Sequence, residues 1–406
     1  MPDKTYGIGI IGAGQIFTDH ADAIEKLGQG MRLVGVADTS AVQLSHAADR
    51  FGPAITTSDY RELLDREDID VIAVCTPPAT HERMVIDALE AGKFVICEKP
   101  LAHSVASADR IREAAARYPG RLSVVYQLRY IPDIQKTVWL RDNGRLGQLT
   151  AGHFIRFDRL SPFATKWWGQ WQTAGGGVAM TQFIHQLDLA CHLFGQPVAV
   201  QAQMDTYAAD IESEDTFAAT IRFESGAIAS CTATLTSQAP PLQQWHIFGS
   251  RGTIQNPWAC HGDNPAQMQR DLQQLDLLYP PLSGPVKQPS MHIAARAFRK
   301  GLRILKLGGH VTPPRATPLH LPYYRAVLQA IRKRLPLPIS ADDAVVSLEL
   351  CTAIYIASLT GESVQLPLDR ANPYCEGLTR DDYQNYRTHA QRSAEGHAHA
   401  GSGSAS

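Results

Sequence analysis

Residues 6–17 read YGIGIIGAGQIF, an apolar run that ends at two glycines, Gly12 and Gly14, before an amphipathic stretch begins. The run predicts a buried strand, and Gly12 would permit a tight turn after it. Gly14 would let the backbone approach a pyrophosphate at the N-terminus of the following helix. Phe17 replaces the third glycine of the G-x-G-x-x-G fingerprint, so the motif alone is also compatible with a glycine turn in any α/β protein.

The rest of the first 125 residues alternates short apolar runs with helical patterns. This alternation predicts βαβ units and therefore an α/β Rossmann domain, with a doubly wound parallel sheet, over residues 1–125. The expected strands are 6–11, 32–37, 70–75, 94–97 and 122–125, and the expected helices are 16–27, 41–51, 81–91 and 105–117.

Asp38 ends the second expected strand, 24 residues after Gly14. A carboxylate there can accept hydrogen bonds from the adenosine ribose hydroxyls, and it would repel a 2′-phosphate. Thr39 and Ser40 follow it, with no adjacent Arg to bind such a phosphate. The expected cofactor is therefore NAD, with NADP less favoured. The alternative is that Asp38 only caps the next helix.

The pattern changes after residue 125. Consecutive short strands without intervening helices predict an α+β domain with an open, mainly antiparallel sheet over residues 126–387. Within it, the Pro- and Gln-rich segment 257–322 is expected to form an irregular insertion, and residues 388–406 a disordered tail. The expected strands are 148–157, 198–206, 216–223, 227–234 and 245–248, and the expected helices are 134–142, 178–194, 323–333 and 342–359.

The composition is that of a chain with a sizeable core: 44% of its 406 residues are hydrophobic and 19% are charged. A net charge of -2 gives no electrostatic reason to bind nucleic acid. No signal peptide and no run of about 20 apolar residues is evident, so no membrane contact is expected. The seven cysteines are scattered and no His/Cys cluster has metal-ligand spacing, which favours a cytoplasmic protein with reduced thiols and no metal.

Three later stretches point to a protein family more specifically than the N-terminal glycine motif does. Residues 74–81 read VCTPPATH, residues 97–102 read CEKPLA, and residues 175–188 read GGGVAMTQFIHQLD. Together with the N-terminal glycines, they resemble the Gfo/Idh/MocA family, named after glucose–fructose oxidoreductase, inositol dehydrogenase and a rhizopine catabolism protein. The resemblance covers residues 6–256 and 323–368. It implies NAD(P)-dependent hydride transfer to or from a carbon of a sugar, polyol or sugar derivative held between the two domains.

The resemblance also assigns residues. The family's lysine corresponds to Lys99, its catalytic histidine to His185 and the following aspartate to Asp188, and the family implies a cis peptide bond between Lys99 and Pro100. Many members carry Asp four residues before the histidine, where this chain has Thr181. Threonine holds no charge, so this departure leaves the substrate and the proton relay open.

Elementary chemistry supports these roles. A histidine can accept the proton of an alcohol near neutral pH while a lysine polarises the same oxygen. In a helix over 178–194, Thr181, His185 and Asp188 would share one face, so Asp188 could orient the imidazole or bind a substrate hydroxyl. The alternative is that these three residues form an ordinary exposed polar face.

The full set of candidate residues divides into two groups. Gln127 could meet the nicotinamide carboxamide, whereas Arg129 could be structural. The cofactor group is Gly12, Gly14, Gln15, Ile16, Asp38, Thr76, Pro77, His81, Glu98, Lys99 and Gln127. The substrate group is Lys99, Arg129, Trp168, Thr181, His185 and Asp188.

Two other functions fit the same motifs. One is an NAD-dependent glycosidase that oxidises its sugar transiently, and the other is a non-catalytic NAD-binding sensor. The presence of Lys99 and His185 argues against the sensor but does not separate dehydrogenase from glycosidase. We also expect a homodimer or homotetramer formed through the outer face of the second sheet, with alternating apolar residues of 216–234 supplying the contact.

Overall fold

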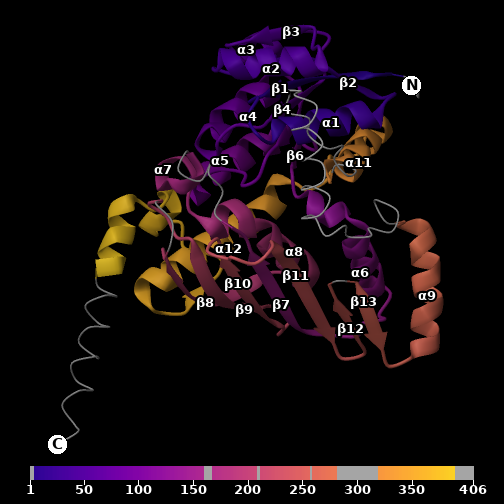
Figure 1. Ribbon diagram of the computed structural model, residues 1–406, viewed down its shortest axis with the longest axis vertical. Helices are drawn as coiled ribbons and strands as arrows, with labels where there is room; N and C mark the ends of the chain where they lie inside the picture. The colour runs from indigo at the N-terminus through magenta and orange to yellow at the C-terminus, as the bar shows by residue number, and fades with distance from the viewer. Residues whose placement is uncertain (1–3, 160–166, 208–210, 257, 281–318, 389–406) are drawn as a thin grey trace, which may run out of the picture.

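The computed structural model describes residues 4–159, 167–207, 211–256, 258–280 and 319–388. Figure 1 shows two sheets, with the N-terminal part of the chain in the upper half and the larger sheet in the lower half. The predicted tail and the stretch 281–318 of the predicted insertion lie outside the described residues, apart from residue 388.

The first sheet is parallel, and its strand order is β3-β2-β1-β4-β5-β6. Its strands read as continuous apolar runs because helices cover both faces; all four residues of β4 are buried. This confirms the predicted Rossmann domain. The elements are β1 (Tyr6–Ile11), α1 (Phe17–Leu27), β2 (Met31–Ala37), α2 (Ala41–Phe51), β3 (Ile55–Thr57), α3 (Arg61–Leu64), β4 (Val71–Val74), α4 (His81–Glu90), β5 (Phe94–Cys97), α5 (Val105–Ala116) and β6 (Leu122–Val124).

The second sheet has the order β13-β12-β11-β7-β10-β9-β8-β14, and every adjacent pair is antiparallel except β7 with β10. The predicted α+β class is therefore confirmed. The elements are α6 (Pro132–Asp142), β7 (Leu149–Phe157), α7 (Trp171–Ala174), α8 (Ile184–Phe194), β8 (Pro197–Asp205), β9 (Thr216–Phe223), β10 (Ile228–Thr234), β11 (Leu242–Gly249), β12 (Gly252–Gln255), β13 (Ala259–Gly262), α9 (Pro265–Leu278), α11 (His320–Lys333), α12 (Ala341–Thr360) and β14 (Val364–Gln365).

The apolar residues of β9 point to the inner face of this sheet. Phe217 and Ile221 are buried, whereas Ala218, Thr220 and Arg222 on the other face are exposed. The prediction that the alternating apolar residues form the outer contact face is thus wrong, because they are needed to pack against the helices that cover the inner face.

Two helices from the end of the chain complete the core. In Figure 1, α11 lies beside α1, and α12 runs between the two sheets. By length and composition α12 could cross a membrane, contrary to our sequence reading, but 78% of its apolar window is buried inside the protein. That burial is typical of a core helix. Because α11 packs on the Rossmann half, the predicted boundary at residue 125 leaves out a later segment that covers it.

The predicted irregular insertion is partly regular. Its described residues contain the strand β13 and the helix α9. Asn264 caps α9 by accepting a hydrogen bond from the backbone of Gln267, and Pro265 occupies the first turn. The sequence reading overlooked this start signal because the surrounding Pro and Gln residues suggested a loop.

Candidate active site

The glycine loop after β1 has open space above it. Gly12 has φ 98°, and a Cβ there would lie 2.6 Å from the carbonyl oxygen of Cys75. A Cβ at Gly14 would meet no atom of the described residues within 4 Å. Gly12 is therefore required by the turn, whereas Gly14 leaves room for a group that approaches the backbone. Gln15 and Ile16 complete the loop at the start of α1, with Gln15 exposed.

Asp38 links the end of β2 to this loop. Its Oδ2 accepts a hydrogen bond from the Ala13 backbone at 2.6 Å, and its Oδ1 accepts one from Ser40 at 2.8 Å. The N-cap of α2 is Ser40 rather than Asp38. A carboxylate oxygen has more than one lone pair, so both oxygens can still accept from ribose hydroxyls.

The loop after β5 carries Lys99 toward the second domain. The Lys99–Pro100 peptide bond is cis, as predicted. The Nζ atom of Lys99 donates to the carbonyl oxygen of Thr181 at 2.7 Å. Burial lowers the pKa of Lys99 to about 8.

Thr181 lies in a π-helical segment, Ala179–Phe183, which precedes α8. The sequence predicted one continuous helix over 178–194, whereas the structure has a wider π-helical turn in the first part of this range. The Thr181 hydroxyl donates to the carbonyl oxygen of Gly177 at 2.6 Å, so its backbone carbonyl, not its side chain, meets Lys99. π segments within helices occur frequently at functional sites.

His185 is the second residue of α8 and is 7% exposed. Within the described part of the chain its Nδ1 atom is buried without a hydrogen-bond partner, while the ring of Tyr126 packs edge-on with a centroid distance of 6.0 Å. Burial lowers its pKa well below the ordinary value, and the charges of Lys99 and Arg156 lower it further. The imidazole is therefore neutral at pH 7 and able to accept a proton.

The carboxylate of Asp188 is hydrogen-bonded to Arg129, and no hydrogen bond joins it to His185 among the described residues. Both of its oxygens accept from the guanidinium of Arg129, at 2.6 and 2.9 Å, and Arg129 also donates to Asp343 at 3.1 Å. The prediction that Asp188 orients the imidazole is wrong, because a buried arginine must be paired and Asp188 is the buried carboxylate that pairs it. Arg129 therefore has the structural role, not a place in the substrate group. The exposed-face alternative is also excluded, because Thr181, His185 and Asp188 are all buried.

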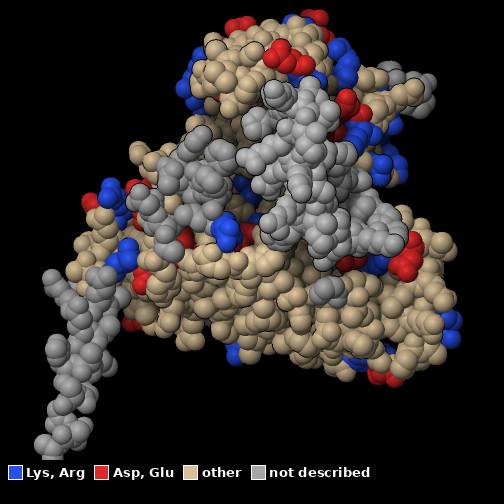
Figure 2. Space-filling model, viewed as in Figure 1, with Lys and Arg blue, Asp and Glu red and all other residues tan. Residues whose placement is uncertain are grey.

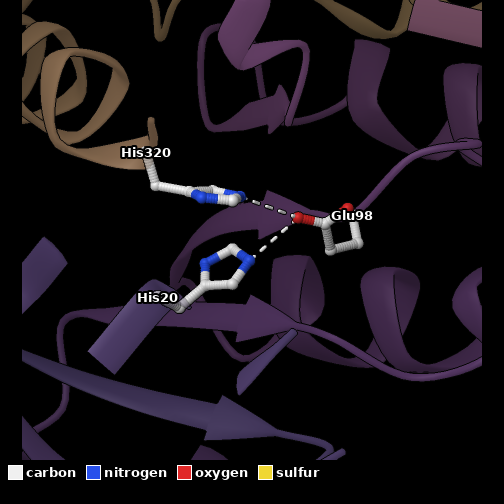
Figure 3. Close-up of side chains that lie close together, drawn as sticks. All are labelled: His20, Glu98 and His320. Atoms are coloured by element: carbon white, nitrogen blue, oxygen red, sulfur yellow. Dashed lines mark hydrogen bonds and ion pairs between the residues drawn. The ribbon is translucent and has the colours of Figure 1, made fainter. Parts of the chain in front are cut away.

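Behind Lys99, three buried side chains from distant parts of the chain converge (Figure 3). The Nε2 atom of His20 lies 2.9 Å from Glu98 Oε1, and that of His320 lies 3.5 Å from the same oxygen. These three residues are close enough to share a metal ion, a possibility that their sequence spacing did not reveal. His20 Nδ1 also meets the hydroxyl of Tyr324 at 2.8 Å.

The Glu98 carboxylate supports the lysine loop. Burial alone would raise its pKa, but His20 and His320 hold the pKa of Glu98 well below its usual range. Its Oε2 accepts a hydrogen bond from the Lys99 backbone at 3.1 Å. Glu98 thus supports the lysine loop through its bonds to His20 and to the Lys99 backbone, and its place in the cofactor group stays a prediction.

His81 is likewise internal. Its ring nitrogens lie 3.1 Å from the carbonyl oxygen of Pro100 and 2.8 Å from that of Thr76, so it joins the loops that follow β4 and β5. Both nitrogens face protein carbonyls, which corrects its assignment as a cofactor contact. Thr76 and Pro77 are half-buried at the end of β4.

Gln127 is 8% exposed, and its Oε1 atom is buried without a hydrogen-bond partner among the residues that the structure describes. A buried acceptor of this kind normally has a donor, and the carboxamide of nicotinamide is one. Together with the space above Gly14 and the carboxylate of Asp38, this orphaned oxygen fits NAD. Trp168 is half-buried beside the exposed Trp167, and the structure does not assign it a contact with a ligand.

Sequence reasoning overlooked two side chains. Glu214 accepts from the backbone of Gly177 at 2.8 Å and of Ala179 at 2.9 Å, so it anchors the start of the helix that carries His185. Arg156 of β7 donates to the side chain of Gln182 at 2.8 Å. Glu214 belongs to no motif. An arginine in a strand indicates a possible functional residue only once it is known which face of the sheet points inward.

The chain matches the two family models in succession. Residues 6–126 match the model described as an oxidoreductase family with an NAD-binding Rossmann fold, and residues 134–255 match the GFO/IDH/MocA C-terminal domain. The two matches cover more than half of the chain.

Similar proteins agree with this result. An uncharacterized oxidoreductase of Bacillus subtilis is 29% identical over 250 residues, which are 60% of this chain and 72% of that protein. Myo-inositol 2-dehydrogenase of Thermotoga maritima is 27% identical over 252 residues, 61% of this chain and 74% of that one. The structure of a WlbA dehydrogenase from Bordetella pertussis, in complex with NADH and UDP-GlcNAcA, superposes with a TM-score of 0.73 at 24% identity, covering 90% of this chain and 99% of that one. The protein is therefore a member of the Gfo/Idh/MocA family of NAD-binding oxidoreductases.

Proposed function

We propose that this protein is a dehydrogenase or reductase that moves a hydride between NAD and a carbon of a sugar, polyol or sugar derivative. The observation that carries the proposal is the hydrogen bond from Lys99 Nζ to the carbonyl of Thr181, one turn before His185. It joins the lysine of the cofactor domain to the helix that bears the histidine. Relatives named myo-inositol 2-dehydrogenase and levoglucosan dehydrogenase support this substrate class.

In the proposed mechanism, NAD would supply the hydride acceptor. The side chains of His185 and Lys99 act on the proton and the oxygen of the reacting hydroxyl. His185 is neutral, so it accepts the proton of the reacting hydroxyl. Lys99, below its pKa of about 8, donates a hydrogen bond to the same oxygen. His185 is buried and Lys99 is half-buried, which strengthens their interactions with the substrate oxygen relative to those in water.

The activity test is a screen for NADH formation with myo-inositol, levoglucosan, free sugars and nucleotide sugars, followed optically. Steady NADH formation with at least one of them supports a dehydrogenase. An NAD-dependent glycosidase would instead cleave glycosides without net NADH, and a sensor would bind NADH without turnover of either kind.

We expect NAD to bind more tightly than NADP. The carboxylate of Asp38 lies at the end of β2 and would repel a 2′-phosphate. The first arginine after it in the sequence, Arg50, is paired with Asp22 at 2.7 Å. Calorimetric titration with both cofactors measures the difference. Asp38→Ala should reduce the difference in affinity between the two cofactors. Tenfold tighter binding of NADP to the unaltered protein would contradict the role given to Asp38.

The oxidation rate should fall above about pH 8. Burial lowers the pKa of Lys99 to about 8, so the ammonium form that donates to the substrate oxygen is present below this pH and is lost above it. The neutral form of His185 persists at lower pH, because its pKa lies well below the ordinary value. The profile of kcat/KM from pH 6 to 9.5 tests this. A rising limb near pH 8 would show that the neutral amine is the base and contradict our assignment.

We also propose that the protein forms a homodimer or homotetramer through the outer face of the second sheet. Ala218, Thr220 and Thr232 are among the outward residues of its central strands, and Figure 2 shows few charged side chains over this half of the molecule. These outward side chains are short, and they are weakly polar rather than strongly apolar. Light scattering at micromolar concentration should report a dimer or tetramer; a monomer would overturn this proposal.

A further inference from the structure

The helix that carries His185 begins with four backbone N–H groups that have no acceptor within it. The first four N–H groups of any helix are in this position. Here they belong to residues 177–180, because the first bond inside the helix runs from the backbone N–H of Thr181 to the carbonyl oxygen of Gly177 at 2.9 Å. All four residues are buried, so their N–H groups must find acceptors within the protein.

Two residues from distant parts of the chain supply all four acceptors. The carboxylate oxygens of Glu214 accept from Gly177 at 2.8 Å and from Ala179 at 2.9 Å, and its backbone carbonyl accepts from the residue between them at 3.1 Å. The hydroxyl of Tyr355, in α12, accepts from Met180 at 3.2 Å and donates to Glu214 at 3.0 Å. Glu214 and Tyr355, here called the cap pair, therefore hold the helix start as one hydrogen-bonded unit.

The glycines before this helix make room for the cap pair. A Cβ at Gly176 would lie 2.0 Å from the hydroxyl oxygen of Tyr355, and a Cβ at Gly177 would lie 1.8 Å from the carbonyl oxygen of Glu214. Both distances are far shorter than a van der Waals contact, so any larger residue would push the cap pair away from the helix. Two of the three glycines in the 175–177 run are therefore required by the close approach of these two residues.

The charge of Glu214 faces the helix rather than a cation. Glu214 is fully buried, and the described residues give it no lysine or arginine as an ion-pair partner. Burial raises the pKa of Glu214 to about 7, so its carboxylate form predominates at pH 8, where the positive end of the helix stabilises it. The titratable groups beside it, Cys351, Tyr355 and Tyr383, have raised pKa values and are neutral at that pH.

The groups that follow the capped residues belong to the proposed active site. The carbonyl of Thr181 accepts from Lys99 Nζ at 2.7 Å, and His185 follows one turn later. The π-helical segment Ala179–Phe183 has no side-chain cap of its own. A shift of the helix start would therefore move both the Thr181 carbonyl and His185 relative to the loop that carries Lys99.

We propose that Glu214 and Tyr355 are positioning residues of the active site, which fix the helix start so that the Thr181 carbonyl and His185 keep their places relative to Lys99. The inference rests on the proposed oxidoreductase function and adds two buried residues that act through others. A misplacement of about 1 Å can cost about 10²-fold in rate, so loss of the cap pair should lower kcat rather than the affinity for substrate or cofactor.

Hydrogen exchange at pH 8, without substrate, tests the cap itself. In the unaltered protein the amides of residues 177–180 should exchange slowly, since all four are buried and bonded. Glu214→Gln places an NH2 group where an acceptor is needed, and Tyr355→Phe removes only the hydroxyl. Each variant should exchange at least about tenfold faster over 175–183, with the other core segments unchanged.

Tyr383→Phe is the matched control. Tyr383 is also buried, and its ring packs on Trp171 at 5.4 Å, as that of Tyr355 does at 5.2 Å. Its hydroxyl meets Thr206 at 2.8 Å and none of the four N–H groups. Tyr383→Phe should therefore leave exchange over 175–183 unchanged.

Kinetics at pH 8 tests the positioning role, with NAD and with myo-inositol, levoglucosan, D-glucose and UDP-glucose as test substrates. For each compound that the unaltered protein oxidises, Glu214→Gln and Tyr355→Phe should lower kcat about 10- to 100-fold. The KM of the compound and the Kd of NADH should stay within about twofold, and Tyr383→Phe should change none of these values. Tyr355→Phe carries the test if Glu214→Gln does not fold.

The contrary outcomes are distinct. Slow exchange over 175–183 in both variants would show that the cap pair does not hold the helix start. Fast exchange there with normal kcat, or an equal loss of kcat in Tyr383→Phe, would show that the cap pair has no positioning role. If the unaltered protein oxidises none of the compounds, the proposed function fails and the positioning role fails with it, whereas the exchange result still decides whether the cap pair holds the helix.

Discussion

Lys99→Ala and His185→Ala should each lower kcat by about 10²–10⁴-fold while NAD still binds, since a positioned acid–base group contributes roughly this much. Lys99 Nζ is fixed by the carbonyl of Thr181, and His185 follows one turn later. In the proposed mechanism both groups act on one substrate oxygen, from opposite domains.

The double variant provides a stricter measurement. Because the two side chains serve one proton transfer, their combined effect on kcat should be smaller than the product of the single effects. Lys26→Ala and His261→Ala change exposed residues of the same types and should leave kcat unchanged. Near-normal turnover in either single variant, on the true substrate, would show that the mechanism is incorrect.

Asp188→Ala should destabilise the protein by about 3–5 kcal/mol, because it leaves the guanidinium of Arg129 buried without its main partner. The two side chains are 1% and 10% exposed, and their bonds join α8 to the segment before α6. Asp343, which is 42% exposed, retains only one bond to Arg129. Denaturant unfolding of the protein without cofactor measures the loss.

A surface pair gives the comparison for this variant. Arg251 and Asp263 are 58% and 53% exposed, so Asp263→Ala should cost at most about 1 kcal/mol. Equal losses in Asp188→Ala and Asp263→Ala would show that burial does not govern the Arg129 pair. Normal stability with a large loss of substrate affinity in Asp188→Ala would instead return Asp188 to the substrate group.

Local patterns in the sequence predicted the bounds of several elements. The strands β1, β5 and β9 begin and end where the sequence placed them, because apolar runs or alternation bounded by turn residues is a local property. The short strands β3 and β14 were overlooked because two or three residues show no period. The π-helical start of the His185 helix was overlooked too, since a π turn depends on the packing around it.

The sequence by itself determined the fold class, since the alternation of apolar runs and helical patterns is a local property. It also showed the glycine loop and the family resemblance from which the assignment of Lys99 and His185 comes. Only the tertiary structure decided what surrounds them. Asp188 shares a helix face with His185 in sequence, yet the buried charge of Arg129, 59 residues away, takes its carboxylate. His20, Glu98 and His320 likewise meet only because α11 packs on α1. Burial forces each charged group to find a partner in space, and which partner is nearest is set by the packing of distant segments rather than by spacing along the chain.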